Sequence, residues 1–401
     1  MNVLVLNCGS SSIKYQVIYM QNESLLAKGL VERIGGEETI FNYQKIGSEK
    51  IKNVAQNINY EKAISIILNT ICDKQIGVLS DIHDLNAIGH RVVHGGEYFF
   101  DSQLITDEVE KRIEECIDLA PLHNPANLEG IKILRKMLPD VPNIAVFDTA
   151  FHQTMPKNSF IYALPYNLYN KYKIRRYGFH GTSHKYVAEQ AALKLGKPLN
   201  ECNLITCHLG NGCSITAIKN GISVDTSMGF TPLEGLMMGT RCGDIDPYIV
   251  LYLMEKENLS IEQVNSLMNK QSGLLGISGI SNDIRLIWEE VKKGNEQAQL
   301  ATDMFIYRLR KYIGSYIAVL GRVDAIVFTA GIGENDEHVR EKALIGLEEI
   351  GISIDLEKNI ELNRKEGEIS KPESKIKVFI IPTNEELAIA KDTKKIVDSI
   401  K

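Results

Sequence analysis

The sequence predicts an α/β protein of more than one domain, and three observations lead to that prediction. The chain has 401 residues, which at roughly 150 residues per domain corresponds to two or three domains. Apolar runs short enough for buried strands alternate with segments of helical periodicity, which is typical of α/β proteins. Hydrophobic residues make up 44% and charged residues 24% of the chain, a globular composition that excludes disorder, collagen-like repeats and a coiled-coil rod.

Charge and cysteine usage narrow the class of protein further. The formal net charge is −6, so the chain lacks the broad basic surface that nonspecific nucleic-acid binding needs, although a local basic cluster can still bind a small anion. Seven cysteines without CxxC spacing, mostly in apolar runs, indicate a reducing compartment rather than disulfides or a zinc knuckle. Without a signal-peptide pattern or an apolar run near 20 residues, we expect a cytoplasmic protein with no membrane partner.

The first half of the chain opens with two strands and a polar turn between them. A helix start is predicted at Asn124 and Pro125, with Asn as the N-cap and Pro in the first helical position. That helix ends before Pro139, and a short buried strand then ends at Asp148. The expected strands are 3–6, 13–19 and 144–147, and helical periodicity covers 59–73 and 106–118.

The second half repeats the opening pattern of strand, polar turn and strand. Ser183 is expected to cap a helix that runs to about Leu195 and is ended by Gly196 and Pro198. The strand, turn and strand that follow suggest a weak internal duplication with one hairpin in each half. The expected strands are 203–207, 214–218, 323–329 and 378–381, and the expected helices are 247–256, 260–271, 295–320, one after residue 335 and one at the C-terminus.

Three junctions after buried strands combine glycine with small polar residues: Asn7–Ser12, His208–Gly212 and Gly331–Asn335. Glycine lets the backbone approach a ligand, and exposed N–H groups bind phosphate oxygens. The third junction lacks the last glycine of the dinucleotide fingerprint, and the chain has no GxxxxGK[ST] motif. We therefore interpret the three junctions as a nucleotide site between two domains, with ordinary tight turns as the alternative.

Several charged residues stand beside small or apolar ones. Lys14 can reach phosphate from the second strand, and Arg91 with Val93 suits a short-chain carboxylic acid, with the guanidinium for the carboxylate and Val for the alkyl end. His180 precedes a helix start, where a phosphate-facing histidine is plausible, whereas Gly181 argues against a zinc motif. Arg241 stands between glycines and can extend into a cleft to stabilise phosphoryl transfer. The alternative for Lys14 is a solvated side chain, and the alternative for Arg91 is an exposed arginine on an edge strand.

Together these segments resemble the acetate kinase (acetokinase) family over essentially the whole chain. VLNCGSSSIK (5–14) and AIGHRVVHGG (87–96) look like the family's two signature segments. GFHGTSH, HLGNG, GTRCGD, GIGEN and PTNEEL follow in the family's order. The one departure is Cys8, where a smaller Ala is expected.

The resemblance implies a fold of the actin, sugar kinase and Hsp70-like superfamily. This fold has two related actin-like (ribonuclease H-like) α/β domains with an active-site cleft between them. The implied first domain comprises residues 1–148 plus 385–401 and holds acetate and magnesium. The implied second domain, 149–384, binds the nucleotide and forms the homodimer that is typical of the family.

The family's functional residues carry over onto matching positions of this chain. Asn7 and Glu385 match the metal-associated positions, Arg91 the acetate-binding arginine, and His180 and Arg241 the transition-state stabilisers. The remaining matches are Asp148 as proton donor or acceptor; Val93, Leu122, Phe179 and Pro232 as the pocket for the methyl group; and Lys14, His208, Leu209, Gly210, Asn211, Gly212, Asp283, Ile284, Arg285, Gly331, Ile332, Gly333, Glu334 and Asn335 as ATP-binding positions.

The implied activity is reversible in-line phosphoryl transfer from ATP to acetate, giving acetyl phosphate and ADP, with Mg²⁺ or Mn²⁺. The family also implies coupling to phosphate acetyltransferase in acetyl-CoA biosynthesis. Acetate is already ionised near pH 7, so we expect Asp148 to orient the metal or its waters rather than to act as a base.

Three alternative functions remain open. The first is a kinase for propionate or another short-chain fatty acid, against which the size of Val93 favours acetate. The second is an ATP-dependent binding switch of the actin or Hsp70 type, for which the chain has no spare length. The third is a sugar-sensing transcription regulator, which would need a DNA-binding helix pair before the strand at residue 3.

Overall fold

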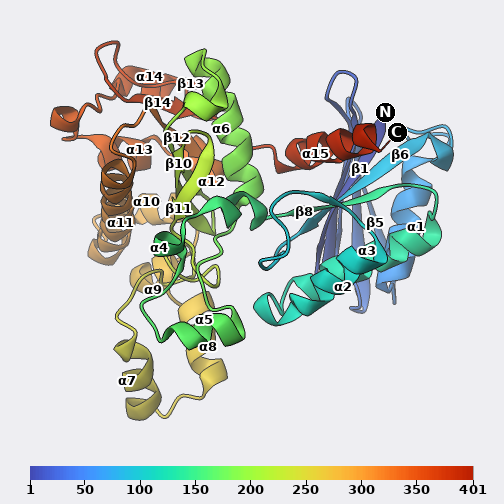
Figure 1. Cartoon of the computed structure of the whole chain (residues 1–401), viewed down its shortest axis with the longest axis horizontal. Coiled ribbons are helices and arrows are strands. Elements are labelled where there is room, and N and C mark those ends of the chain that lie inside the picture. Colours follow the sequence, from blue (N-terminus) through green and yellow to red (C-terminus); the bar gives the residue numbers. More distant parts are fainter. Residues whose placement is uncertain (401) are drawn as a thin grey trace. The chain divides into compact units, whose positions relative to one another are not determined.

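The computed structural model describes residues 1–400 and separates the chain into two compact units (Figure 1). The first unit comprises Met1–Gln153 with Asn384–Lys401, and the second comprises Thr154–Thr383. Each unit is built on one β-sheet. Among residues 1–400, no helix combines the length and the apolar character that a membrane crossing requires.

The first sheet mixes an antiparallel meander with parallel strands. β1 pairs antiparallel with β2 and parallel with β6, and β6 pairs parallel with β8. Its strand order is β5-β4-β3-β2-β1-β6-β8-β7. The strands are β1 (Asn2–Gly9), β2 (Ser12–Tyr19), β3 (Ser24–Glu32), β4 (Glu38–Lys45), β5 (Ile51–Gln56), β6 (Leu85–Val92), β7 (Gln103–Leu104) and β8 (Asn143–Phe147).

Helices cover both faces of this sheet. Successive side chains of β1 point to opposite faces, so Val3 and Val5 pack with α15 (Glu385–Ser399). Leu4 and Leu6 belong to the other core, together with residues of α1 (Tyr60–Ile71). Burial on both faces explains why the first strand is continuously apolar.

The helix α3 (Asn124–Met137) begins differently from the prediction. His123, not Asn124, is the N-cap residue, and its side chain makes no capping hydrogen bond. Asn124 is buried, its amide donates to the carbonyl oxygen of His94 at 2.9 Å, and its oxygen accepts from the His94 N–H at 3.1 Å. The prediction of Asn124 as the cap was wrong because this side chain connects α3 to the segment after β6. The other helix of this region is α2 (Asp107–Glu115).

The second sheet has the strand order β11-β10-β9-β12-β14-β13. β9 pairs antiparallel with β10 and parallel with β12, and β12 pairs parallel with β14. Its strands are β9 (Leu204–Leu209), β10 (Cys213–Lys219), β11 (Ile222–Thr226), β12 (Ala325–Thr329), β13 (Gly367–Glu368) and β14 (Lys377–Ile380).

The two sheets share one internal arrangement. The order β3-β2-β1-β6-β8 in the first unit matches β11-β10-β9-β12-β14 in the second, with the same parallel and antiparallel pairings at each position. The two predicted hairpins are β1–β2 and β9–β10, so the predicted internal duplication is confirmed.

Two helices of the second unit differ from the sequence prediction. α6 (Gly181–Leu195) begins after His180, which takes a left-handed φ of 57°, so Ser183 lies inside the helix and is not its cap. Residues 330–335 form the short helix α12 (Ala330–Asn335) rather than a glycine-rich turn. The remaining helices are α4 (Lys157–Phe160), α5 (Tyr166–Tyr172), α7 (Tyr248–Lys256), α8 (Ile261–Lys270), α9 (Gly273–Ser278), α10 (Ile284–Lys292), α11 (Glu296–Leu320), α13 (Glu337–Leu344) and α14 (Leu356–Glu361).

Candidate functional site

In the first unit, three polar residues stand side by side at one edge of the sheet. Asn7 and Arg91 lie near the carboxyl ends of β1 and β6, and Asp148 directly follows β8. These three strands are parallel neighbours, so their carboxyl ends meet at the same edge, where open α/β sheets bind ligands. The local sequence therefore places an amide, a guanidinium and a carboxylate together.

Arg91 and Asp148 form a bidentate ion pair. Nε of Arg91 donates to both Asp148 oxygens at 3.1 and 3.0 Å, and Nη2 donates to Oδ2 at 2.5 Å. The Asp148 side chain is 2% exposed and the Arg91 side chain 23%. Burial alone would lower the pKa of Arg91, but the carboxylates of Asp148 and Glu385 raise it above its usual value. The guanidinium is therefore firmly charged and held in one orientation.

The N-terminus of α15 brings more carboxylates to this cluster. The pKa of Glu385, in the first turn, is raised by burial and by Asp148, although Arg91 lowers it. The next residue, Glu386, forms an ion pair with Lys14, which stands opposite Asn7 in the hairpin. The cluster thus keeps more negative than positive charge around Glu385.

The apolar residues predicted for a methyl pocket fall into both units. Val93 is buried, and its N–H donates to Asn127, whereas Leu122 is 72% exposed. Phe179, also buried, and Pro232 belong to the second unit. Two of the four predicted pocket residues, Val93 and Leu122, therefore belong to the first unit, and the other two belong to the second.

Three predicted residues of the second unit gather around Gly212. The rings of His180 and His208 stack with their centroids 4.1 Å apart and an interplanar angle of 20°. A Cβ added to Gly212 would stand 3.2 Å from Nη1 of Arg241 and 3.6 Å from Nε2 of His180. Because glycine has no Cβ, it leaves the space between the Arg241 guanidinium and the His180 ring open.

Arg241 carries a charge that no carboxylate in residues 1–400 neutralises. Its Nη1 donates to the carbonyl oxygen of Pro232 at 3.2 Å and contacts the Met238 sulfur at 3.7 Å. Among residues 1–400, no acidic side chain lies within ion-pair distance of Arg241. Burial lowers the pKa of this guanidinium because it disfavours the charged form. An anion bound beside Arg241 would offset that free-energy cost of burying the charge.

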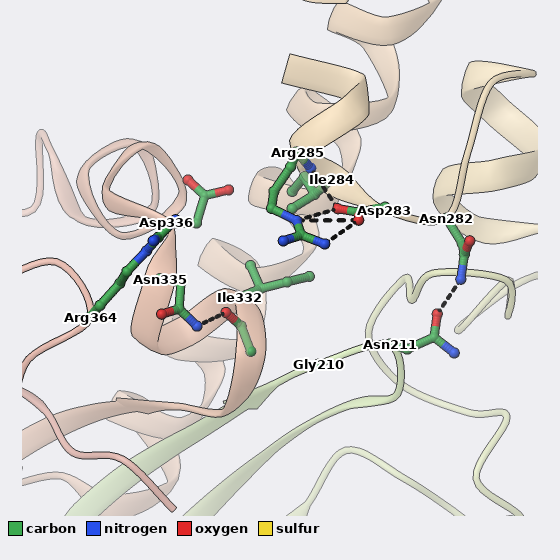
Figure 2. A pocket seen from close by; sticks show the side chains of 11 residues that line it. Gly210, Asn211, Asn282, Asp283, Ile284, Arg285, Ile332, Asn335, Asp336 and Arg364 are labelled. Carbon is green, nitrogen blue, oxygen red and sulfur yellow. Dashed lines mark hydrogen bonds and ion pairs between the residues drawn. The ribbon is translucent and has the colours of Figure 1, made fainter. Parts of the chain in front are cut away.

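A cavity of about 610 Å³ opens beside the turn between β9 and β10 (Figure 2). Its volume is in the range of small-molecule sites. The predicted nucleotide-binding residues that line it are Gly210, Asn211, Asp283, Ile284, Arg285, Gly331, Ile332 and Asn335. Lys14, His208, Leu209, Gly212, Gly333 and Glu334 do not line it.

The cavity wall is fixed by local hydrogen bonds, which Figure 2 shows as dashed lines. Asn211 accepts from the amide of Asn282 at 2.9 Å. Asp283 caps α10 and binds Arg285 with an Nη2–Oδ2 distance of 2.5 Å, and hydrogen bonds from Arg285 lower the pKa of Asp283. The cavity therefore presents amides and a paired arginine, groups that can hold a polar ligand.

Three residues that line the cavity were not predicted from the sequence: Asn282, Asp336 and Arg364. Asn282 directly precedes the predicted Asp283, so its position was a usable signal. Asp336 caps α13 and accepts from Trp288 at 2.8 Å, a contact that the sequence does not reveal. Arg364 reaches the cavity from a distant loop with a left-handed φ of 66°.

Glu334 has a structural position behind the cavity. Its Oε1 accepts from the N–H of Ala330 at 2.7 Å and from the N–H of Thr383 at 3.1 Å. It therefore joins the start of α12 to the segment after β14. This geometry gives Glu334 a supporting position in the second unit.

A divalent cation fits the donors of the first unit chemically. Among residues 1–400, no group of three or more His, Cys, Asp or Glu side chains is arranged as a complete metal cage. Mg²⁺ is commonly held by one or two carboxylates together with substrate phosphates and waters, and it prefers oxygen donors. Asn7, Asp148 and Glu385 offer such oxygens, and the raised pKa of Glu385 marks a carboxylate that a cation would stabilise.

Two sheets with one strand order, each presenting polar residues at its strand ends, define the class of two-domain actin-like α/β folds. The chain belongs to the acetokinase family, whose model matches residues 2–391. It is 58% identical over 402 residues to an acetate kinase of Caldanaerobacter subterraneus subsp. tengcongensis, an alignment that covers all of both chains.

Solved structures agree with this family assignment. A Porphyromonas gingivalis acetate kinase aligns with a TM-score of 0.96 at 48% identity and covers 99% of each chain. A propionate kinase from Francisella tularensis aligns with a TM-score of 0.91 at 44% identity, over 98% of this chain and 99% of that chain.

Proposed function

We propose that this chain is an acetate kinase that transfers the γ-phosphoryl group of ATP to acetate, reversibly, and forms acetyl phosphate and ADP. The observation that carries the proposal is the Arg91–Asp148 pair. Asp148 engages Nε and Nη2 of Arg91, while Nη1 has no hydrogen-bond partner among residues 1–400. A fixed guanidinium with one free N–H edge suits a small carboxylate.

The first unit then supplies the acceptor side of the reaction. Arg91 binds the carboxylate of acetate, and Val93 borders its methyl group. Acetate is ionised near pH 7 because carboxylic acids titrate near 4, so its oxygen attacks the γ-phosphorus without a general base. A bond forms between that oxygen and phosphorus, the bond from phosphorus to the β–γ bridging oxygen breaks, and ADP leaves with its electron pair.

Asn7 and Glu385 are the residues that would hold Mg²⁺, with Asp148 beside them. When bound, the cation supplies charge neutralisation for the phosphates of ATP. Asp148 orients Arg91 through the bidentate hydrogen bonds, and its carboxylate partly neutralises the charge of the guanidinium. We infer that Asp148 orients the metal site as well and does not exchange a proton with acetate.

The second unit supplies the phosphate side. Arg241, which has no carboxylate partner among residues 1–400, stabilises the charge that spreads over the transferred group, and His180 donates a hydrogen bond to that group. The turn 208–212 and the cavity lined by Asp283, Arg285 and Asn335 hold the nucleotide, and Lys14 is a further proposed nucleotide-binding residue. Positioning and charge stabilisation account for most of the catalysis in phosphoryl transfer.

One assay tests the proposal. The purified chain with ATP and Mg²⁺ is given acetate, propionate or butyrate, and acyl phosphate is trapped with hydroxylamine as the hydroxamate. Acetate should give the highest kcat/KM. If none of the three acids yields hydroxamate above an ATP-free control, the proposal fails.

Propionate is the second candidate substrate because a propionate kinase aligns with the chain over nearly its whole length. Val93 is buried and follows Arg91 by two residues, and its size favours the shorter acid. One methylene is worth only about 10- to 200-fold in kcat/KM, so some activity with propionate is expected. A kcat/KM for propionate above that for acetate would reverse the assignment.

We further propose a homodimer that forms through the second unit, in the cytoplasm, with metabolic coupling to phosphate acetyltransferase. α7 exposes Tyr248, Leu251 and Tyr252, an apolar surface that a second copy would cover. Light scattering after gel filtration should give twice the mass of 44.9 kDa, and Leu251→Asp should reduce it to the monomer mass.

A further inference from the structure

A buried chain of hydrogen bonds leads from the middle of the second sheet to His180. The hydroxyl of Thr206 on β9 lies 2.7 Å from Nδ1 of His184, and Nε2 of His184 lies 2.7 Å from Oγ of Ser214 on β10. Oγ of Ser214 lies 2.9 Å from Nδ1 of His180. Thr206, His184 and Ser214 are fully buried, so water cannot substitute for these partners.

The protons of this chain can be placed by counting donors and acceptors. The Thr206 hydroxyl has one hydrogen-bond partner among residues 1–400, Nδ1 of His184, and a buried hydroxyl donates its proton where it can. In neutral His184 the proton then sits on Nε2, which donates to Ser214. The hydroxyl proton of Ser214 is left for Nδ1 of His180. Neutral His180 therefore carries its own proton on Nε2.

We propose that Ser214 is a positioning residue that fixes the tautomer and ring orientation of His180. Nε2 of His180 is the nitrogen that faces Gly212, where a Cβ would stand 3.6 Å away. A donor on that nitrogen points toward the turn that binds phosphate in the proposed function, on which this inference rests. The opposite tautomer would present a lone pair to an anion and repel it.

The stacking of His208 on His180 supports this assignment. It restrains the plane of the His180 ring, while the Ser214 hydrogen bond restrains its rotation in that plane. His208 is itself held by Ser183, whose Oγ lies 2.8 Å from Nδ1 of His208. Two serines thus orient the two stacked rings from different elements.

The tautomer can be measured directly. In the full-length protein labelled with ¹⁵N-histidine, spectra that correlate ring nitrogens with ring protons distinguish a protonated from an unprotonated nitrogen, and His180→Gln assigns the signals. We expect a protonated Nε2 and an unprotonated Nδ1 in neutral His180. In Ser214→Ala the two forms should mix. A proton on Nδ1 of wild-type His180 would overturn the inference.

Kinetics supply the second readout. Ser214→Ala should lower kcat about 10- to 100-fold, the loss seen when the partner that orients a metal-bound histidine is removed, with KM for ATP and acetate nearly unchanged. Ser214→Thr, which keeps the hydroxyl, should recover most of kcat. The matched control is Ser227→Ala, because Ser227 is equally buried and, among residues 1–400, its hydroxyl accepts only from the Ile215 N–H.

The outcomes separate the inference from the proposed function. A Ser214→Ala enzyme with kcat within twofold of wild type, or as impaired as Ser227→Ala in stability and activity alike, would overturn the inference. His180→Ala with unchanged kcat would overturn the proposed role of His180, and the nitrogen spectra would still decide whether Ser214 sets its tautomer.

Discussion

The two units present opposite electrostatic designs on sheets of the same strand order. In the first unit the cations are paired, Arg91 with Asp148 and Lys14 with Glu386, and Glu385 adds negative charge. In the second unit Arg241 has no carboxylate within reach among residues 1–400. A cluster with paired cations and an excess carboxylate suits a metal ion beside a small carboxylate substrate, whereas an uncompensated guanidinium suits a phosphate. The shared strand order therefore gives each unit one edge of the sheet where a ligand can bind. The side chains at the strand ends determine which ligand each edge binds.

The unpaired arginine should give the largest effect. We expect Arg241→Ala to lower kcat about 10³-fold or more, because losing an arginine that stabilises the transferred phosphoryl group costs that much. KM for acetate should change little. Initial rates from the hydroxamate assay measure both constants.

The matched control is Arg310→Ala, because Arg310 also donates to a backbone carbonyl, that of Ile345, but lies on the surface of the same unit. A 10³-fold loss in the control, or an Arg241→Ala enzyme whose defect lies only in KM for acetate, would break the contrast between the two units.

The paired arginine should act on binding and on stability. Arg91→Ala is expected to raise KM for acetate about 10- to 100-fold, since a hydrogen bond to a charged group is worth about 1.5–3 kcal/mol. It also strands the buried Asp148 carboxylate, which should lower the free energy of unfolding by about 3–5 kcal/mol. Denaturant titration measures that loss.

The double variant Arg91→Ala/Asp148→Asn should recover part of the lost stability, because it removes the stranded charge. Arg112→Ala serves as the control, since its ion pairs with Glu108 and Glu115 lie on the surface of the first unit. Equal losses in the free energy of unfolding for Arg91→Ala and Arg112→Ala would show that the buried ion pair contributes no more to stability than the surface pairs.

The raised pKa of Glu385 predicts a pH and metal dependence. In the metal-free protein the carboxylate that Mg²⁺ needs is ionised above the raised pKa, so Mg²⁺ binding should weaken as the pH falls through it, at a higher pH than for an ordinary glutamate. In metal-free protein the sign for stability is opposite. There the protonated form is favoured on folding, so this contribution is lost as the pH rises through the raised pKa.

Glu385→Gln should remove the acidic limb and raise the Mg²⁺ concentration for half-maximal rate about tenfold, the value of one lost charged interaction. Rate profiles against pH at several Mg²⁺ concentrations test this. Glu23→Gln is the control, because Glu23 pairs with Lys391 on the same helix α15. An acidic limb that survives in Glu385→Gln and vanishes in Asp148→Asn, with metal affinity intact, would assign a proton-transfer role to Asp148.

The sequence predicted the hairpins and most of the long helices because their signals are local. β1 and β9 are apolar runs followed by glycine and polar residues, and α1 and α11 carry helical periodicity with an asparagine cap. The cap predictions failed at Asn124 and Ser183, because both side chains bond to segments distant in the sequence. Asn124 binds His94, and Ser183 binds Thr383.

The candidate site was predictable where a residue stands in a motif and not where tertiary contact creates its surroundings. Arg91, His180 and Arg241 occur in motifs that the resemblance covers. Ser214 is an unremarkable serine in an apolar strand, and only the fold brings it to His180, 34 positions away. Likewise, the raised pKa of Glu385 arises from Arg91, Asp148 and burial, which no local pattern reveals.

The smallest expected effect concerns the alkyl end of the acid. Val93→Ala should shift the ratio of kcat/KM for propionate over acetate upward about fourfold, because about 0.8 kcal/mol per buried methylene becomes available to the longer acid. KM for ATP should not change if Val93 serves the acceptor side alone. Val54→Ala is the matched control, since Val54 is exposed on the edge strand β5 of the same sheet. An unchanged ratio would remove Val93 from the acid site, and a raised KM for ATP would place it on the phosphate side.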